Sequence, residues 1–368
     1  MDAAALRALL ASIPEPPEPP EPPEPPGPPG PPGSPEPGVP PVTDAVIDAL
    51  VDASVRYLAS PAAADSLARD TYWPKWDSPW WHMLLLHELG LADRIPPAIV
   101  ARMVDRLDAL PLHHFPIHPG DRPPGADPWR DSTCHCAIGN LHQVLTACGV
   151  DVRAALPWLE PWFARYQLPD GGANCDETAY LSGEPDASSM VAIIATMEAA
   201  LGGRAGAVSP EATARHRDFL ARAAGFLVDR RLVEGSRSRH NAEERESARA
   251  WPLLGFPRFY FYDVLRGLTA LVRWADSTAA VVPLAVVAPV AAHLAAAFPD
   301  GVARVGRRAL DLHPTTIAFV GGAWGRHPTS TFPLLDAVSV VGAASAPLTR
   351  EWTDTRRAIV RLADSGRL

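Results

Sequence analysis

The sequence predicts an all-α fold, an α/α toroid in which inner and outer helices alternate around a closed ring. Helical periodicity extends through residues 42–368, and apolar helices alternate along the chain with amphipathic ones. A Pro-Asp-Gly turn recurs after two of the expected outer helices, at 168–171 (LPDG) and 298–301 (FPDG). Such alternation is typical of helical repeats, and helices that are apolar on most sides need cover all round. These observations favour a ring that closes on itself.

The chain is expected to divide at residue 41. Residues 14–41 contain 17 prolines in an acidic, repetitive stretch that cannot bury a core. Residues 1–41 are therefore expected to be a disordered Pro-rich segment, and residues 42–368 a single toroid domain. A ligand for a proline-binding domain is the alternative interpretation of this segment.

The inner helices are expected where apolar residues cover most of the helix surface. The first of these stretches, 79–91, carries two tryptophans and a run of leucines. The others are mostly apolar, and the fourth is also rich in aromatic residues. The expected inner helices start near residues 79, 134, 187, 257 and 332.

Most of the outer helices are expected where one face is charged. In 42–58 the apolar residues recur at helical spacing on one face of the helix. In 96–110 the charged residues lie on the face opposite the apolar ones. The expected outer helices are 42–58, 96–110, 151–167, 211–232, 278–298 and 349–362.

Composition excludes several classes of function. A formal net charge of −9 argues against a nucleic-acid partner, because phosphates require a basic surface. Four cysteines are too few for a disulfide scaffold in 368 residues. The apolar run 279–298 contains two prolines and a histidine, which favours a buried helix over a transmembrane segment. No signal peptide is recognisable, so a cytoplasmic location is expected.

The stretch 166–180 (YQLPDGGANCDETAY) joins two expected helices through a polar, glycine-containing loop. Polar loops on a rigid helical scaffold frequently carry binding or catalytic residues. Its segment Gln167-x3-Gly171-x-Ala173 is similar to the QW motif of squalene and oxidosqualene cyclases, with alanine in place of tryptophan. The following 174–179 (NCDETA) resembles their acid motif, D-x-D-D-T-A.

The layout therefore resembles the terpenoid cyclase and protein prenyltransferase superfamily of α/α toroids. The resemblance implies an apolar small-molecule substrate, such as an isoprenoid, or a peptide, held in a central aromatic-lined cavity. It places Asp176 at the position of the acid that protonates the substrate. Such an acid needs a pKa raised by burial, so Asp176 is expected to face the cavity and to be partly shielded.

Large aromatic and polar residues gather where the loops enter the expected inner helices. In a ring these loops meet at one end, where aromatic faces would stabilise a cation by about 0.5–2 kcal/mol per contact. Core filling is the alternative for each residue taken singly. The candidate substrate-binding residues are Trp80, Trp81, His82, Phe259, Tyr260, Tyr262 and Asp263.

A second candidate site combines Cys134, His135 and Cys136 with Cys175, some forty residues later. Thiolates are soft ligands that suit a tetrahedral zinc site, and a helix start lowers thiol pKa values. The three cysteines are the candidate metal ligands, and His135 is a candidate catalytic residue. The set is similar to the zinc site of lanthionine cyclases, which are also α/α toroids. Buried free cysteines with no metal are the alternative.

Two further functions follow as alternatives to a cyclase or prenyltransferase activity. The first is an enzyme with a zinc-thiolate site that activates a thiol or water. The second is a scaffold without catalysis that binds a peptide or lipid in the same cavity, since toroids host several chemistries.

Overall fold

The structure is a computed structural model, and it is mostly helical, as predicted. It describes residues 1–16, 44–112, 120, 122–128, 130–132, 134–203, 209–239 and 241–368. The predicted Pro-rich segment falls mainly outside these ranges. Within them, no helix has the length and apolar character that crossing a membrane requires.

The described residues contain sixteen α-helices, three short 3-10 helices and one pair of strands. The α-helices are α1 Ala3–Ser12, α2 Asp44–Leu58, α3 Pro61–Arg69, α4 Pro79–Glu88, α5 Pro97–Asp108, α6 His135–Ala147, α7 Val152–Ala155, α8 Leu159–Arg165, α9 Thr178–Leu181, α10 Met190–Gly202, α11 Pro210–Asp229, α12 Ala242–Ser247, α13 Val264–Thr278, α14 Leu284–Ala297, α15 Pro333–Val338 and α16 Ala346–Asp364. The 3-10 helices are Ala92–Arg94, Ala248–Ala250 and Ala309–Leu312, and the strands are β1 Thr315–Val320 and β2 Ala323–Pro328.

Local sequence signals explain where many of these helices begin. Ser189, Ser209, Asp263 and Ser345 each precede a helix in an extended conformation and accept a hydrogen bond from a backbone N–H of its first turn. Such a cap satisfies one of the donors that a helix start leaves without a partner, and contributes about 1 kcal/mol. The sequence therefore encodes the starts of α10, α11, α13 and α16 locally.

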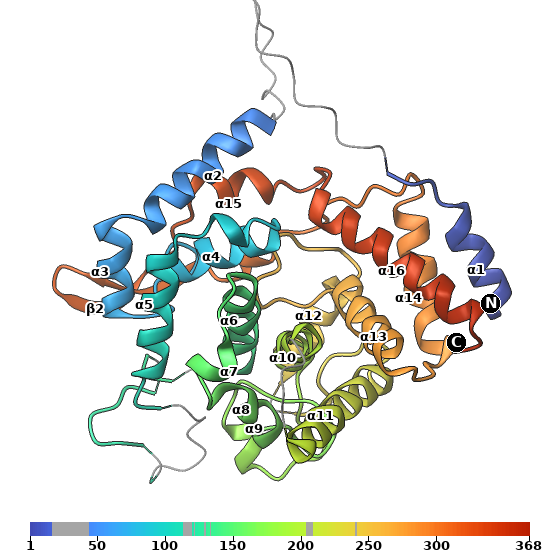
Figure 1. Ribbon diagram of the computed structural model, residues 1–368, viewed down its shortest axis with the longest axis horizontal. Coiled ribbons are helices and arrows are strands. Elements are labelled where there is room, and N and C mark those ends of the chain that lie inside the picture. Colours follow the sequence, from blue (N-terminus) through green and yellow to red (C-terminus); the bar gives the residue numbers. More distant parts are fainter. Residues whose placement is uncertain are drawn as a thin grey trace, which may run out of the picture.

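Five helices follow one another in chain order through packing. Helix α4 contacts α6, α6 packs along α10, α10 contacts α13, and α13 packs on α16 (Figure 1). All five contribute to the walls of one cavity of about 550 Å³, which we call the five-helix cavity. Helix α11 contacts α10 and α13 of this series, and it also contacts α8.

Helices form at four of the five positions predicted for inner helices, namely α4, α6, α10 and α13. The fifth prediction is wrong. In the expected helix 332–344 only α15 forms, and it packs on α2, whereas the charged helix α16 lines the five-helix cavity. The cavity wall is itself charged, so a helix with arginines and acids on its inner face fits there.

The prediction of an entirely helical chain is wrong at β1 and β2. These strands pair antiparallel, with Val320 opposite Ala323, and leave Gly321 and Gly322 as a two-residue turn. Both glycines have positive φ, at 62° and 87°, which is the backbone of a type I′ hairpin turn. The β-branched residues of β1 suit an extended strand.

The expectation of one unstructured segment over 1–41 is corrected for residues 3–12, which form α1. This helix packs on α16 and α14 and buries Leu6 and Leu10. The chain beyond α1 is also held, because Arg356 donates hydrogen bonds to the carbonyl oxygens of Ile13 and Pro14, at 2.6 and 2.9 Å. Residues 17–41 lie outside the described part.

Candidate metal centre

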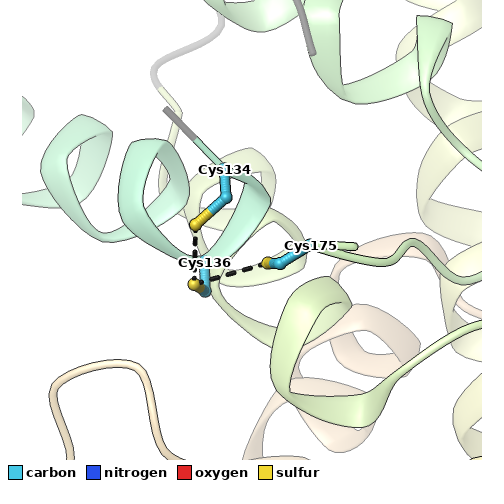
Figure 2. Close-up of side chains that lie close together, drawn as sticks. All are labelled: Cys134, Cys136 and Cys175. Atoms are coloured by element: carbon cyan, nitrogen blue, oxygen red, sulfur yellow. Dashed lines mark hydrogen bonds between the residues drawn. The ribbon is translucent and has the colours of Figure 1, made fainter. Parts of the chain in front are cut away.

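Three cysteine side chains converge at the start of α6. The Sγ atoms of Cys134 and Cys136 lie 3.2 Å apart, and those of Cys136 and Cys175 lie 3.5 Å apart. All three sulfurs lie within 4.8 Å of one another, and none forms a disulfide (Figure 2). This three-cysteine cluster could hold a metal ion, as the sequence predicted for the same three residues.

The backbone at the start of α6 explains how Cys134 and Cys136 face one point. Cys134 is the residue before the first turn and is extended, with φ −120° and ψ 169°, whereas Cys136 is already helical. The change of conformation turns the Cys134 side chain towards Cys136, which two positions inside one helix would not do.

Cys175 reaches the cluster from a loop that is tied at several points. Asn174 donates its backbone N–H to Tyr180 Oη at 3.1 Å and its side-chain N–H to the Ala187 carbonyl at 2.7 Å. Ser189 N donates to the Ala173 carbonyl at 2.8 Å. These bonds anchor the two residues before Cys175 and bring its side chain to the start of α6.

The QW-like segment has a structural role in this loop. Gln167 donates to the carbonyl oxygens of Gly171 and Phe219, at 2.8 and 3.0 Å, and so joins the turn to α11. Gly171 has φ +90°, and a Cβ there would lie 2.3 Å from the Arg222 carbonyl oxygen. Glycine is therefore required by both backbone conformation and close packing.

The thiols of the cluster influence one another's ionisation. Hydrogen bonds from Cys136 and Cys175, together with the Ala137 N–H at the helix start, lower the pKa of Cys134 well below its usual value. The hydrogen bonds to Cys134 raise the pKa of Cys136 and of Cys175 well above theirs. Cys134 therefore ionises first, and a bound cation would displace the protons of the other two.

Lys75 is the only lysine of the chain, and its ammonium group lies among aromatic rings. Its Nζ is between 5.2 and 6.0 Å from the ring centroids of Tyr72, Trp73, Trp76 and Tyr260. It also donates to Tyr260 Oη at 3.1 Å. Contacts of this kind stabilise a cation, whereas burial lowers the lysine pKa.

The charge of Lys75 acts on the three-cysteine cluster. It favours the ionised form of the Cys136 thiol, and thiolates at Cys136 and Cys134 in turn favour the protonated lysine. Sequence analysis did not select Lys75. The sequence does contain one signal for Lys75, because it is the single lysine among 33 basic residues.

His135 does not join the cluster, although it lies between two of its cysteines. Its side chain is fully buried, with its ring centroid 4.2 Å from that of Trp162. Burial lowers the pKa of His135 to about 3, so the imidazole is neutral at physiological pH. The prediction of His135 as a catalytic residue is therefore not supported, because a fully buried ring has no surface for a substrate.

The prediction that Asp176 faces a cavity and is partly shielded is wrong. Its side chain is exposed and accepts hydrogen bonds from the backbone N–H and the hydroxyl of Thr178, the first of these at 2.9 Å. Its own N–H donates to Asn174 Oδ1. Asp176 is thus a turn residue before the short helix α9, without the apolar neighbours that a proton-donating acid requires.

The predicted substrate-binding residues separate into different environments. Phe259 lies in the wall of the five-helix cavity, and Tyr260 lies beside Lys75. Trp80 and Trp81 are buried in the core. His82 shares a 2.6 Å hydrogen bond with Ser54 and stacks on Phe332. The Tyr262 hydroxyl donates to the Leu232 carbonyl, and Asp263 caps α13.

An aromatic layer lies between Lys75 and the five-helix cavity. Trp76 stacks on Phe259 with ring centroids 5.6 Å apart, and Trp81 meets Phe259 edge-on at 5.1 Å. These rings fill the core around Lys75, so they do not line an open aromatic cavity. The expectation of an aromatic-lined central cavity is corrected accordingly.

Ten of the 22 residues that line the five-helix cavity are charged. Arg266 donates to both carboxylate oxygens of Glu198, to Asn140 Oδ1 and to the carbonyl oxygens of Phe259 and Phe261. This buried network joins α6, α10 and α13. Sequence analysis did not identify Asn140, Glu198 or Arg266, because each belongs to a different helix and none forms a motif.

Comparisons with protein-family models, with curated protein sequences and with solved structures find no match to this chain. Inferences about its function therefore depend on the geometry described above.

Proposed function

We propose that this protein is an enzyme that binds zinc through Cys134, Cys136 and Cys175 and uses the site to activate a thiol substrate. The observation that carries the proposal is the convergence of three sulfur atoms within 4.8 Å of one another. Two come from the start of α6 and the third from a separate, anchored loop. Such convergence of unpaired cysteines from distant segments is typical of a metal site.

The sulfur spacing fits zinc. A tetrahedral ion with Zn–S bonds of about 2.3 Å separates its sulfur ligands by roughly 3.8 Å. The two closest pairs in the cluster are 3.2 and 3.5 Å apart, so small side-chain rotations would accommodate the ion. Thiolate ligands also select zinc over magnesium and calcium, which prefer oxygen.

The number of protein ligands supports a catalytic role. Among the described residues the cluster offers three ligand atoms, and catalytic zinc sites keep their fourth position for water or substrate. Cys134 and Cys175 are partly exposed, so the cluster can be reached from solvent. Zinc bound there would supply a thiolate nucleophile at neutral pH.

Charge favours a thiol over water as the activated group. Three thiolates exceed the charge of Zn²⁺ by one, which makes the ion a weak Lewis acid and keeps a further sulfur ligand electron-rich. Lys75 provides a nearby positive charge that would offset this excess. The lysine would therefore stabilise the loaded site and orient a negatively charged sulfur.

We further propose that the helices form an α/α toroid, with α4, α6, α10, α13 and α16 as its inner helices. Their succession around one cavity in chain order supports this arrangement. A cyclase-type activity on an isoprenoid is less well supported, because it needs an acid at Asp176 and that side chain is exposed. A binding scaffold without catalysis would not need three converging thiols.

Cobalt substitution tests the proposal. Co²⁺ titrated into metal-free full-length protein should give thiolate charge-transfer absorption, and adding 2-mercaptoethanol should change the ligand-field bands by occupying the fourth position. Cys175→Ser should weaken the charge-transfer absorption, whereas Cys148→Ser should not, because Cys148 contacts the Ala92 carbonyl away from the cluster. A spectrum insensitive to thiol would indicate a closed structural site and contradict the proposed activity.

A further inference from the structure

A second candidate site, independent of the cysteines, is the five-helix cavity. Its wall carries five carboxylates and five guanidinium groups contributed by four of the five helices and the loop before α13. These residues are Glu88, Glu198, Asp276, Glu351, Asp354, Arg258, Arg266, Arg273, Arg350 and Arg361. Enclosing charge is costly unless each group finds a partner, so a cavity with such a wall suits a charged ligand.

Part of this wall is already paired. Glu198 is bound by Arg266, Glu351 by Arg258, and Asp276 by Arg361. These pairs join neighbouring segments of the wall and need no ligand.

One buried donor in the wall lacks a partner. Arg258 is only 9 % exposed, and its Nε and Nη1 donate to Asp263 and Glu351. Its Nη2 is buried and has no hydrogen-bond partner among the described residues. A buried donor without an acceptor destabilises a fold, and more so when it is charged. Arg258 therefore points to an acceptor that the chain itself does not supply.

Two further guanidinium groups of the wall form no ion pair within the described residues, Arg273 on α13 and Arg350 on α16. Arg350 extends towards the end of α4, where its Nη2 would lie 3.6 Å from a Cβ placed on Gly90. Both side chains are exposed, which places them at the open side of the cavity. Together with Arg258 they offer donors for one carboxylate.

Acidic groups accompany these donors on α16. Glu351 follows Arg350 directly, and Asp354, one turn later, has only a distant contact with Arg357, at 3.9 Å. These carboxylates would repel a multiply charged phosphate but attract an ammonium group. We propose that the five-helix cavity binds a small zwitterion of the α-amino-acid class, with its carboxylate towards Arg258, Arg273 and Arg350 and its ammonium towards Asp354.

Calorimetric titration of the full chain tests this proposal. The probes are the individual L-amino acids, with acetate, ethylamine and inorganic pyrophosphate as ligands that carry one kind of charge. At least one amino acid should bind at one site per chain, and more tightly than any of the three single-charge probes. Binding of pyrophosphate without binding of any amino acid would overturn the proposal, and so would binding of no probe.

Variants locate the binding. Arg350→Gln and Asp354→Asn should each weaken binding by about tenfold or more, because each removes a charged partner of the ligand. Arg304→Gln is the matched control, because that arginine pairs with Asp300 and is not part of the cavity wall. Equal affinities for all variants would overturn the assignment. Cys175→Ser should bind as the unaltered protein does, which separates this site from the metal centre.

Discussion

The Sγ atoms of Cys136 and Cys175 lie 3.5 Å apart, although 39 residues separate them in the chain. The contact depends on two structures, the start of α6 and the loop that leads into α10. Since α6 and α10 pack along each other, their interface determines whether the cysteines meet. The candidate metal centre is thus a property of the tertiary fold more than of a local motif.

The α6–α10 interface should be sensitive to one methyl group at Gly139. A Cβ at this position would lie 2.5 Å from the carbonyl carbon of Ala195 and 2.6 Å from the backbone nitrogen of Thr196. Backbone atoms cannot move aside cheaply, so Gly139→Ala should lower the free energy of unfolding by about 1–3 kcal/mol. Urea denaturation followed by circular dichroism measures the change.

The control for this substitution is Gly225→Ala in α11. A Cβ at Gly225 meets nothing within 4 Å, and alanine is favoured over glycine inside a helix by about 1 kcal/mol. This variant should be slightly more stable than the unaltered protein. A loss of stability at Gly225 as large as that at Gly139 would contradict the packing argument.

Stability should depend on pH through Asp70. Its carboxylate accepts hydrogen bonds from the N–H groups of Tyr72 and Trp73, at 2.8 and 2.9 Å, but burial raises its pKa from 3.8 to about 6. The folded protein therefore binds more protons than the unfolded chain between these two pH values. The free energy of unfolding should fall as pH rises through this window, by on the order of 2–3 kcal/mol.

Asp70→Asn should remove this loss. Both hydrogen bonds go to one oxygen of Asp70, and the asparagine oxygen can accept them without charge. The variant should be more stable at pH 7 and should lack the contribution of Asp70 to the pH slope between 4 and 6. Asp65→Asn, exposed on α3, is the matched control for the loss of one carboxylate. Destabilisation of Asp70→Asn at pH 7 would show that the ionised form is favoured in the fold.

The N-terminal helix should contribute to the stability of the whole domain. Leu6 is fully buried against the body, so Leu6→Ala should cost about 2–5 kcal/mol. Arg7→Ala is the control, because its ion pair with Asp364 is half exposed and contributes less than about 1 kcal/mol. Equal stability of Leu6→Ala and Arg7→Ala would show that α1 does not contribute.

Replacing 17–41 by an equally long Gly/Ser linker should leave the melting temperature unchanged, since prolines and glutamates in that stretch favour water.

Much of the helical content was predictable because its signals are local. The apolar stretches that begin at 79 and 134 became α4 and α6 within a residue, and serine or aspartate caps precede α10 and α13. The Gly321-Gly322 pair after the β-branched residues of β1 is an equally local signal of a hairpin, which a wholly helical interpretation of this region overlooks. That omission led to the wrong prediction of a wholly helical chain.

The site was predictable only in part. Thiols at a helix start and a third thiol in a polar loop suggested the metal ligands, and the structure brings these three together. The role of Asp176 could not be predicted in the same way, because the same local sequence fits an exposed turn residue and a buried acid. The charged residues of α16 predicted an outer helix, because the cavity was expected to be apolar. The cavity wall that these residues line is itself charged.

The central claim is that Cys134, Cys136 and Cys175 bind zinc, and metal analysis of the purified full-length protein tests it most directly. Inductively coupled plasma mass spectrometry should find about one zinc per chain, in keeping with a single cluster of three thiol ligands. Cys175→Ser should lower the zinc content well below that value, and Cys148→Ser should retain it. Protein that is folded but contains no zinc, and that does not take up zinc when it is supplied, would contradict the account.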